Sequence, residues 1–441
     1  MSEIAQIKGT CALPESKDME LWGGVEYTYN RVRERYFDQT KFSGYDRRLT
    51  DYEKFAGLGI RTLRFGLLWE RYERDQSWRW FDERLVRCQE LGIRPIAGLL
   101  HHGSGPPHTS LLDPQFPEKL AAYAGAVARR YPWIDAYTPV NEPNTTARFS
   151  GMYGVWYPHH QSQTSYLQAL LNQLKGTVLS MDAIRRVRPD AQLIQTDDLG
   201  RVSGTRELES VTEVLNLRRW LPYDLLCGSV DRQHPLFAYI HAAGIPEADI
   251  LWFSEHPCPP FIIGLNYYVT SDRYLDHRTD LYPEDRRSAE GRFVDVEAVR
   301  ASHNGISGVG DLLSEAWDRY GIPLAITEVH LGCTVDEQIR WMVESWKGAM
   351  HARRQGVECL SMTAWALLGS FYWNELVTRE NGHYESGVFD VRSGEPVATD
   401  LARIVAQIAN GGAPHHPALA HLGWWRQGSR LCYPQRLVEA A

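Results

Sequence analysis

Short apolar runs alternate with amphipathic stretches along most of the chain. The runs have the length and the apolar character of buried strands, and the stretches between them repeat apolar residues with a helical period. Strands are predicted at residues 21–26, 60–66, 93–100, 136–140, 192–196, 261–266, 324–327 and 360–366. Helices are predicted at residues 48–57, 82–90, 117–130, 166–187, 207–219, 310–320, 336–355 and 399–408.

The number and order of these elements predict an α/β fold, the (β/α)₈ TIM barrel with insertions and a C-terminal extension. A doubly wound sheet, the competing topology, would place a glycine-rich phosphate turn after the first strand. Residues 22–26, Trp-Gly-Gly-Val-Glu, are not that turn. We predict one barrel domain over residues 1–441, with an N-terminal tail (1–20), an insertion (204–255) and an extension (411–441). Trp424 and Trp425 of the extension are expected to dock on the barrel surface.

Composition narrows the class of protein and of partner. Of the 441 residues 43% are apolar, which is enough for a large core. The net charge of -8 comes without a basic stripe, so we expect no nucleic-acid partner. Residues 1–18 lack the apolar run of a signal peptide, and no stretch is long enough to span a membrane. Seven scattered cysteines without a CxxC pair indicate free thiols and a cytoplasmic location. The oligomeric state is left open.

Two predicted strands end in a glutamate, Glu142 in Thr-Pro-Val-Asn-Glu-Pro-Asn and Glu328 in Ala-Ile-Thr-Glu-Val-His. Active sites of (β/α)₈ barrels lie at the carboxyl ends of the strands, where the loops converge. Glycosidic-bond cleavage needs two carboxyl groups, one to protonate the leaving oxygen and one to attack the sugar or activate water. Polar groups near the other strand ends also suit a carbohydrate substrate: Glu26, Asn30, Arg64, His101, His102, Asn141, Asp197, Asp198, Asn266, Tyr268 and Trp365.

At these residues the chain resembles glycoside hydrolase family 1, the β-glucosidase and β-galactosidase family of retaining (β/α)₈ enzymes. The resemblance extends over roughly residues 21–408 and is best at residues 112–144. It implies that Glu142 is the general acid/base, that Glu328 is the nucleophile and that Asn141 binds the sugar 2-hydroxyl. The other implied roles are Arg64 beside the nucleophile, Tyr268 hydrogen-bonded to it, His101 on the sugar, and a platform of Trp365, Phe371 and Trp373.

Physical chemistry gives this pair distinct requirements. A nucleophile must be ionised, and a guanidinium and a phenol beside Glu328 would lower its pKa. An acid/base must start protonated, so Glu142 needs a less polar setting or a neighbouring negative charge that raises its pKa. In a retaining enzyme the two carboxyl groups stand about 5–5.5 Å apart, against about 6.5–9.5 Å in an inverting one.

Three positions depart from the family pattern. Val329-His330 stand where the family usually has Asn-Gly after the nucleophile, and Asn30 stands where it has a glutamine. Tyr372 replaces the glutamate that grips the sugar's outer hydroxyls, which removes a charge-assisted contact. We therefore predict the same chemistry on a sugar other than plain glucose, such as a deoxy, acidic or otherwise modified one. The variant also resembles the barrel half of bacterial fusions with nucleotide-sugar reductase-like domains, and the chain ends before such a domain.

Other site chemistries fit the sequence less well. Adjacent histidines at 101–102, 159–160 and 415–416 invite a metal, but metal hydrolases on this barrel place a His-x-His at the end of strand 1. No lysine lies at a predicted strand end, which excludes a Schiff-base aldolase. We predict no metal and no cofactor. Two alternatives to hydrolysis stay open: a catalytically silent sugar-binding barrel and a transglycosylase using the same carboxylates. Catalysis is favoured over silent binding, because ionisable groups gathered in a pocket cost stability.

Overall fold

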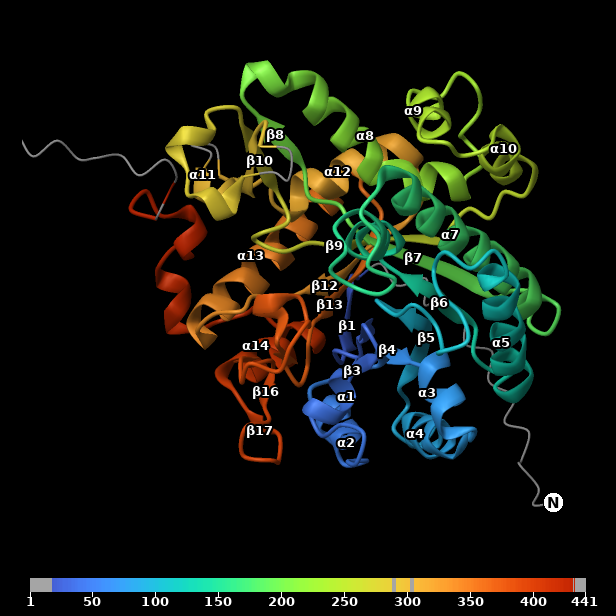
Figure 1. Cartoon of the computed structure of the whole chain (residues 1–441). Coiled ribbons are helices and arrows are strands. Elements are labelled where there is room, and N and C mark those ends of the chain that lie inside the picture. Colours follow the sequence, from blue (N-terminus) through green and yellow to red (C-terminus); the bar gives the residue numbers. More distant parts are fainter. Residues whose placement is uncertain (1–17, 288–290, 302–304, 431, 433–441) are drawn as a thin grey trace, which may run out of the picture.

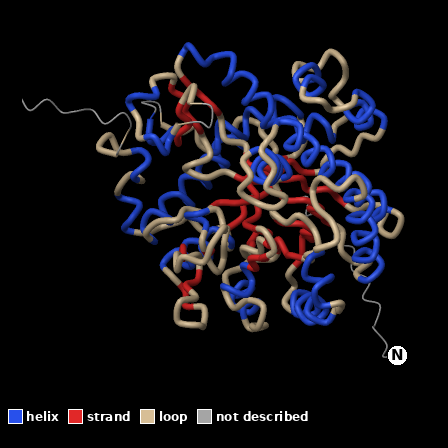
Figure 2. Tube along the Cα trace, viewed as in Figure 1, coloured by secondary structure: helices blue, strands red, loops and turns tan. Residues whose placement is uncertain are grey.

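The computed structural model describes residues 18–287, 291–301, 305–430 and 432, and its centre is a closed barrel of eight parallel strands (Figures 1 and 2). All eight predicted strands are barrel strands, and β13 pairs with β1 to close the barrel. In chain order they are β1 (Glu20–Gly24), β4 (Thr62–Gly66), β5 (Arg94–His101), β6 (Ala136–Asn141), β7 (Gln192–Asp198), β9 (Ile262–Asn266), β12 (Leu324–Val329) and β13 (Cys359–Ala364). The predicted (β/α)₈ fold is thus confirmed.

A helix follows every barrel strand and lies on the outside of the barrel (Figure 1). These helices are α2 (Asp51–Gly57), α4 (Arg79–Glu90), α5 (Phe116–Arg130), α7 (Gln163–Arg185), α8 (Glu209–Leu226), α12 (Val309–Tyr320), α13 (Val335–Arg354) and α14 (Asp400–Ala409). Their apolar residues recur with the helical period: α14 buries Leu401, Ile404, Val405 and Ile408. Shorter helices lie in the connections: α1 (Gln39–Phe42), α3 (Trp69–Asp75), α6 (Pro143–Ala147), α9 (Phe237–Ala242), α10 (Glu247–Glu255) and α11 (Ala298–Ala301).

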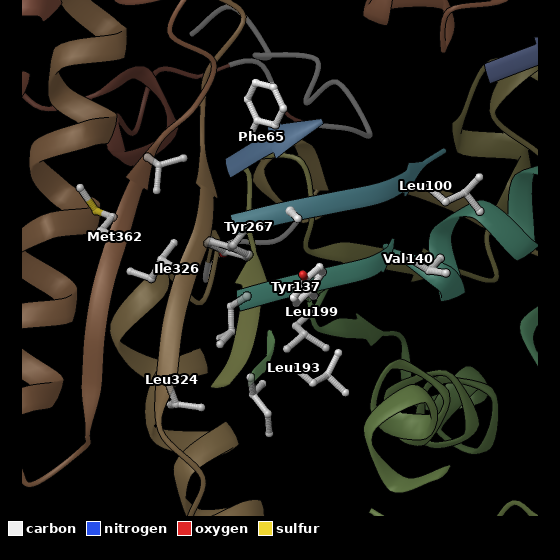
Figure 3. Close-up of a cluster of buried hydrophobic side chains, with 14 of the residues drawn as sticks. Phe65, Leu100, Tyr137, Val140, Leu193, Leu199, Tyr267, Leu324, Ile326 and Met362 are labelled. Atoms are coloured by element: carbon white, nitrogen blue, oxygen red, sulfur yellow. The ribbon is translucent and has the colours of Figure 1, made fainter. Parts of the chain in front are cut away.

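Two apolar layers hold the barrel together. The outer one lies between the strands and the helices, and Figure 3 shows part of it, with Leu193, Leu324, Ile326 and Met362 among its residues. The inner one fills the barrel with Trp22, Ile96, Ala136, Ile194, Ile262 and Ala325. Successive residues of a strand face opposite sides, so β12 sends Leu324 and Ile326 outward and Ala325 inward. Because the interior is packed, the barrel offers its chemistry at the strand ends.

The longest elaborations follow β7 and β9. β8 (Val202–Gly204), β10 (Arg273–Asp276) and β11 (Val294–Glu297) form a separate three-stranded sheet beside α8. The sequence predicted an insertion only at 204–255, and the structure adds the segment that carries β10 and β11. The predicted helix at 207–219 ends too early, since α8 continues to Leu226 through Pro222 with Leu221, Leu225 and Leu226 fully buried.

Small two-stranded sheets and the C-terminal extension complete the described chain. The sheets are β2 (Tyr29–Val32) with β3 (Arg35–Asp38), β14 (Ser370–Phe371) with β15 (Tyr384–Glu385), and β16 (Phe389–Asp390) with β17 (Val397–Ala398). In the extension Trp425 is 1% exposed, lies 5.4 Å from the Trp341 ring of α13, and donates its indole N–H to Glu344. Across the described residues no helix has the length and apolar character to cross a membrane.

Candidate active site

A cavity of about 1990 Å³ lies over the carboxyl ends of the strands. Its wall includes residues at or just after the ends of seven barrel strands: Glu26, His102, Glu142, Asp198, Tyr268, Glu328 and Trp365. A substrate in this cavity would therefore meet several strand ends at once, as the barrel geometry requires. Both glutamates singled out in the sequence belong to this wall.

Glu328 lies near the end of β12 between two strong donors. Arg64 of β4 donates from Nη1 to Glu328 Oε1 over 2.8 Å, and both side chains are almost fully buried. The Tyr268 hydroxyl donates to the other oxygen, Oε2. Arg64 also donates to the Thr327 carbonyl oxygen over 2.7 Å, which ties the guanidinium to the backbone of the strand that carries Glu328. The carboxylate is thus fixed in position with each oxygen bound.

Glu142 follows β6 directly and has a different surrounding. Its backbone is left-handed, with φ 45°, a conformation that non-glycine residues rarely adopt and that is enriched at functional sites. Asn266 at the end of β9 donates to Glu142 Oε1 over 2.6 Å, while His102 Nε2 lies 3.9 Å from Oε2. Among the described residues no arginine or lysine forms a salt bridge with Glu142. A neutral amide is therefore the main donor to this carboxyl group.

The two surroundings shift the pKa values of the glutamates unequally. Burial, followed by the negative charge of Glu328, raises the pKa of Glu142 well above its ordinary value. Asp198 and Asp197 add to this rise, and the Asn266 hydrogen bond opposes it. Burial also raises the pKa of Glu328, but the charge and hydrogen bonds of Arg64 and Tyr268 counteract it. The sequence predicted a lowered pKa for Glu328, and the structure differs because full burial outweighs the two donors.

Asn141 and His101 lie buried beside the glutamates. Asn141 Oδ1 accepts from Arg64 Nη2 over 2.6 Å and from Thr196 Oγ1 over 2.8 Å, and its amide nitrogen lies 3.4 Å from His101 Nε2. Burial lowers the pKa of His101 well below its ordinary value, which keeps the imidazole neutral. The structure thus joins Asn141 and His101 to Arg64 in one hydrogen-bonded group next to Glu328.

Trp365 and Trp373 are two of the aromatic residues of the cavity wall. The Trp365 ring lies 5.6 Å from the His101 ring in a stacked arrangement, with the Arg64 guanidinium 4.8 Å from its centroid. A Cβ at Gly24 would come within 2.4 Å of Trp365, so glycine at the end of β1 is what admits this ring. The indole nitrogen of Trp373 is buried and has no hydrogen-bond partner.

Asn30 and Tyr372, like Asn141, His101 and Arg64, are not among the residues that line the cavity. Asn30 is fully buried in the β2–β3 hairpin and donates to the Val377 carbonyl oxygen over 3.1 Å. The Tyr372 ring packs against Phe42, 5.0 Å away, and against Phe371. Their role as sugar ligands stays a prediction.

The cavity wall also holds polar groups that sequence reasoning did not assign a role. Glu26 at the end of β1 has its pKa raised to about 7, mainly by burial and then by the charge of Glu328. His102 contacts Thr146 Oγ1 over 3.0 Å, and His330 contacts Glu385 Oε2 over 3.0 Å. The strand-end rule had drawn attention to Glu26 and His102. Glu385 lies in the long connection after β13, and no sequence signal marks it.

The adjacent histidines are engaged in other contacts. His159 Nε2 accepts from the Arg33 backbone N–H over 2.8 Å, and His416 Nδ1 accepts from the Ala418 N–H over 3.1 Å. In the part of the chain that the structure describes, no three His, Cys, Asp or Glu residues are grouped so that they could hold a metal ion. The absence of a metal centre stays a prediction.

Comparison with known proteins identifies similar folds. No family model matches the chain, and no curated protein sequence matches it. The chain is similar in structure to the β-glucosidase from Thermotoga maritima in complex with deoxynojirimycin, at 16% identity and a TM-score of 0.72 over 90% of this chain and 99% of that one. It is also similar to a structure described as a family 1 β-glucosidase from Thermotoga maritima, at 17% identity and a TM-score of 0.72 over 89% and 98% of the chains. At these identities the similarity shows a shared fold.

Proposed function

We propose that this protein is a retaining β-glycosidase that cleaves its substrate through a covalent glycosyl-enzyme intermediate. The observation that carries the proposal is the unequal pair of glutamates on one cavity wall. Glu328 has a guanidinium and a phenol on its two oxygens, as a nucleophile needs, and Glu142 has a strongly raised pKa, as a proton donor needs. The similar β-glucosidase folds agree with this proposal.

The proposed reaction has two steps on the same two residues. In the first, a Glu328 oxygen attacks the anomeric carbon while Glu142 protonates the departing glycosidic oxygen. In the second, Glu142, now ionised, takes a proton from water, which displaces Glu328 and releases the sugar. Asn141, held by Arg64 and Thr196 through its oxygen, can offer its amide N–H groups to the 2-hydroxyl.

Several wall residues suit the binding of a sugar. The faces of Trp365 and Trp373 can pack against the apolar side of a pyranose ring. The buried, unpartnered indole N–H of Trp373 would gain its missing hydrogen bond from a hydroxyl oxygen. These residues support a carbohydrate as the ligand.

We also propose that Glu385 and Glu26 select the sugar. Glu385 lines the cavity with His330, and both histidines that contact it, His330 and His383, hold its pKa below the ordinary value against the effect of burial. An ionised carboxylate there can accept hydrogen bonds from hydroxyl groups, the role that Tyr372 does not fill. The glycone would then differ from plain glucose in the groups that reach this edge.

The direct test is a panel of 4-nitrophenyl β-glycosides that differ in the sugar, followed by nuclear magnetic resonance of the first product formed. We expect hydrolysis of at least one glycoside with the β-anomer appearing first. Release of the α-anomer would indicate inversion and contradict the mechanism. Failure of the whole panel, with sugar binding retained, would favour a silent sugar-binding barrel, and transfer to added alcohols in preference to water would favour a transglycosylase.

We propose a cytoplasmic location. The six described cysteines are free thiols, a state that a reducing compartment maintains. Fractionation of the producing cells would test this, and recovery of the protein outside the cytoplasm would contradict it.

A further inference from the structure

The cavity wall carries arginines and carboxyl groups in equal number, and Asp295, Glu297 and Glu385 are carboxyl groups on the connecting elements. The carboxyl groups of Glu26, Glu142 and Glu328 lie at strand ends, at the barrel. The arginines of the wall lie on the connecting elements above the barrel: Arg148, Arg218, Arg219, Arg273, Arg286, Arg292 and Arg300.

Two of these arginines are neutralised by carboxylates of the protein. Arg219 on α8 pairs with Glu315 and donates to the Leu199 carbonyl oxygen. Arg273 on β10 pairs with Asp295 over 2.8 Å. Such pairing is the rule for buried cations, because removing a guanidinium from water without a counter-charge is costly.

Arg218, adjacent to Arg219 on the same helix, breaks this rule. It is 8% exposed, and in the described part of the chain it forms no salt bridge. Its neighbours are neutral: the Tyr166 ring, 5.2 Å from the guanidinium carbon, the Met152 sulfur, 3.9 Å from Nη1, and the Tyr239 hydroxyl. A buried cation that lines a cavity and lacks a counter-charge indicates that a ligand supplies one.

Arg148 adds a second guanidinium to this part of the wall. It lies on the short π-helix Arg148–Met152, which begins six residues after Glu142. It donates from Nη2 to Thr145 Oγ1 over 3.2 Å, its Nε is buried without a partner, and it forms no salt bridge with a described carboxylate. Met152 of the same π-helix has its sulfur 3.9 Å from Arg218 Nη1, so the element that carries Arg148 lies next to Arg218.

The position of Glu142 tells which part of a substrate would reach these arginines. The acid/base must touch the leaving oxygen, so the leaving group starts at Glu142. The elements that follow Glu142 along the chain, α6 and the π-helix, also line the cavity, and the π-helix carries Arg148 and Met152. The cavity, at about 1990 Å³, is larger than the roughly 300–1000 Å³ of a common ligand pocket, which leaves room for a leaving group beyond the sugar.

We propose that Arg148 and Arg218 form an anion-binding subsite for a phosphoryl group on the leaving-group side of Glu142. The phosphoryl group fits best, because two guanidinium forks supply two charges and paired N–H donors to a tetrahedral dianion. The assignment of the phosphoryl group to the leaving group rests on the proposed glycosidase function. Binding at the subsite itself can be tested without turnover. Arg218 is the main ligand, since Arg148 is also drawn toward Asp197 and Asp198.

The test is calorimetric titration of the full chain with phenyl phosphate at constant ionic strength, with phenol and benzoate as reference ligands. We expect phenyl phosphate to bind at least tenfold more tightly than either reference. Arg218→Gln should weaken this binding at least tenfold and Arg148→Gln three- to fivefold. Arg218→Lys, which keeps the charge but loses the fork, should fall between the wild type and Arg218→Gln. The matched control Arg273→Gln, on the same wall but paired with Asp295, should change binding less than twofold.

The outcomes separate this inference from the proposed function. Equal affinity for phenyl phosphate and phenol, or unchanged binding in Arg218→Gln with an unaltered melting temperature, would overturn the subsite whether or not the protein hydrolyses glycosides. Tighter binding of benzoate would overturn the phosphoryl assignment. Arginine-dependent binding in a protein that cleaves no glycoside would leave the subsite standing and remove the proposed reaction.

Discussion

The ends of β6 and β12 carry the same residue, a buried glutamate, in opposite surroundings. Glu328 on β12 has Arg64 on one oxygen and Tyr268 on the other. Glu142 after β6 has one neutral donor, Asn266, and the carboxyl groups of Asp197 and Asp198 close enough to raise its pKa. The β12 end therefore favours the charged form of its glutamate more than the β6 end does.

This contrast teaches that the chemical roles come from the neighbours on other strands. Arg64 comes from β4, Tyr268 follows β9, and Asp197 and Asp198 end β7. Both glutamates are buried, and burial alone would raise both pKa values in the same direction. The difference between the proposed nucleophile and the proposed acid is therefore made by where the closed barrel brings its other strand ends.

The largest expected effect comes from deleting each carboxyl group in turn. Glu328→Gly and Glu142→Gly should each lower turnover by several orders of magnitude with the fold intact, because each removes a reacting group. Added sodium azide should then give a different product with each of the two variants. Azide in the space of Glu328 should give an α-glycosyl azide, and azide in the space of Glu142 should give a β-glycosyl azide from the intact glycosyl-Glu328.

The products can be assigned by nuclear magnetic resonance. The same anomer from both variants would break the comparison. Glu297→Gln, a carboxyl change on the same cavity wall, is the control and should keep near-wild-type turnover.

A smaller effect is expected at the phenol that supports Glu328. Tyr268→Phe removes the donor to Oε2, so the pKa of Glu328 should rise further and the acidic limb of kcat/KM should move to higher pH. Loss of this hydrogen bond should lower kcat about 10²- to 10³-fold. Tyr267→Phe is the matched control: it removes a buried hydroxyl that donates to Asp272, and we expect it to lower stability without moving the acidic limb. An unmoved limb in Tyr268→Phe would contradict the support role.

Glu26 at the end of β1 extends the comparison to stability. Its pKa is raised from 4.5 to about 7, chiefly by burial, so the unfolded chain ionises first as the pH rises. The contribution of Glu26 to the free energy of unfolding is therefore fully present below about pH 4.5. It decreases as the pH rises from about 4.5 to about 7, by on the order of 3 kcal/mol. Glu26→Gln should raise the melting temperature at pH 8 and leave it nearly unchanged at pH 4.

The control for this measurement is Glu255→Gln, at an exposed position near the end of α10, which should have little effect at either pH. Destabilisation of Glu26→Gln at pH 8 would show that the ionised carboxylate of Glu26 is favoured by its surroundings.

The smallest expected effect is a pH shift from the β7 end. The negative charge of Asp198 raises the pKa of Glu142, so Asp198→Asn should lower that pKa. The alkaline limb of kcat/KM, which reports protonated Glu142, should then move to lower pH, with kcat changed only a few-fold. Pre-steady-state and steady-state pH profiles would measure it. A shift of this limb to higher pH would contradict the role given to the β7 carboxyl groups.

The barrel was predictable because its signals are local. Apolar runs such as Leu324–Val329 and helical periods such as that of α14 are encoded within a few residues. Active sites of such barrels lie at the carboxyl ends of the strands. The predicted strand ends therefore identified Glu142 and Glu328 as candidate site residues.

The parts of the site that escaped prediction depend on long connections. The burial of Asn30 and its hydrogen bond to the Val377 carbonyl oxygen join residues some 350 positions apart, which no local pattern predicts. Glu385 enters the cavity from a connection after β13 whose path no strand end fixes. The pKa of Glu328 is raised because the side chain is fully buried. Burial depends on the whole fold, so the two predicted donors, Arg64 and Tyr268, were not enough to predict the direction of the shift.

Trapping with a 2-deoxy-2-fluoro glycosyl donor tests the central claim most directly, because the fluorine slows the second step and lets the covalent intermediate accumulate. Mass spectrometry of the digested protein should find the mass of one fluorosugar on the peptide that contains Glu328, and none in Glu328→Gly. A label on the peptide that contains Glu142, or turnover of the donor without any labelled peptide, would contradict the assignment of the β12 carboxylate as the nucleophile.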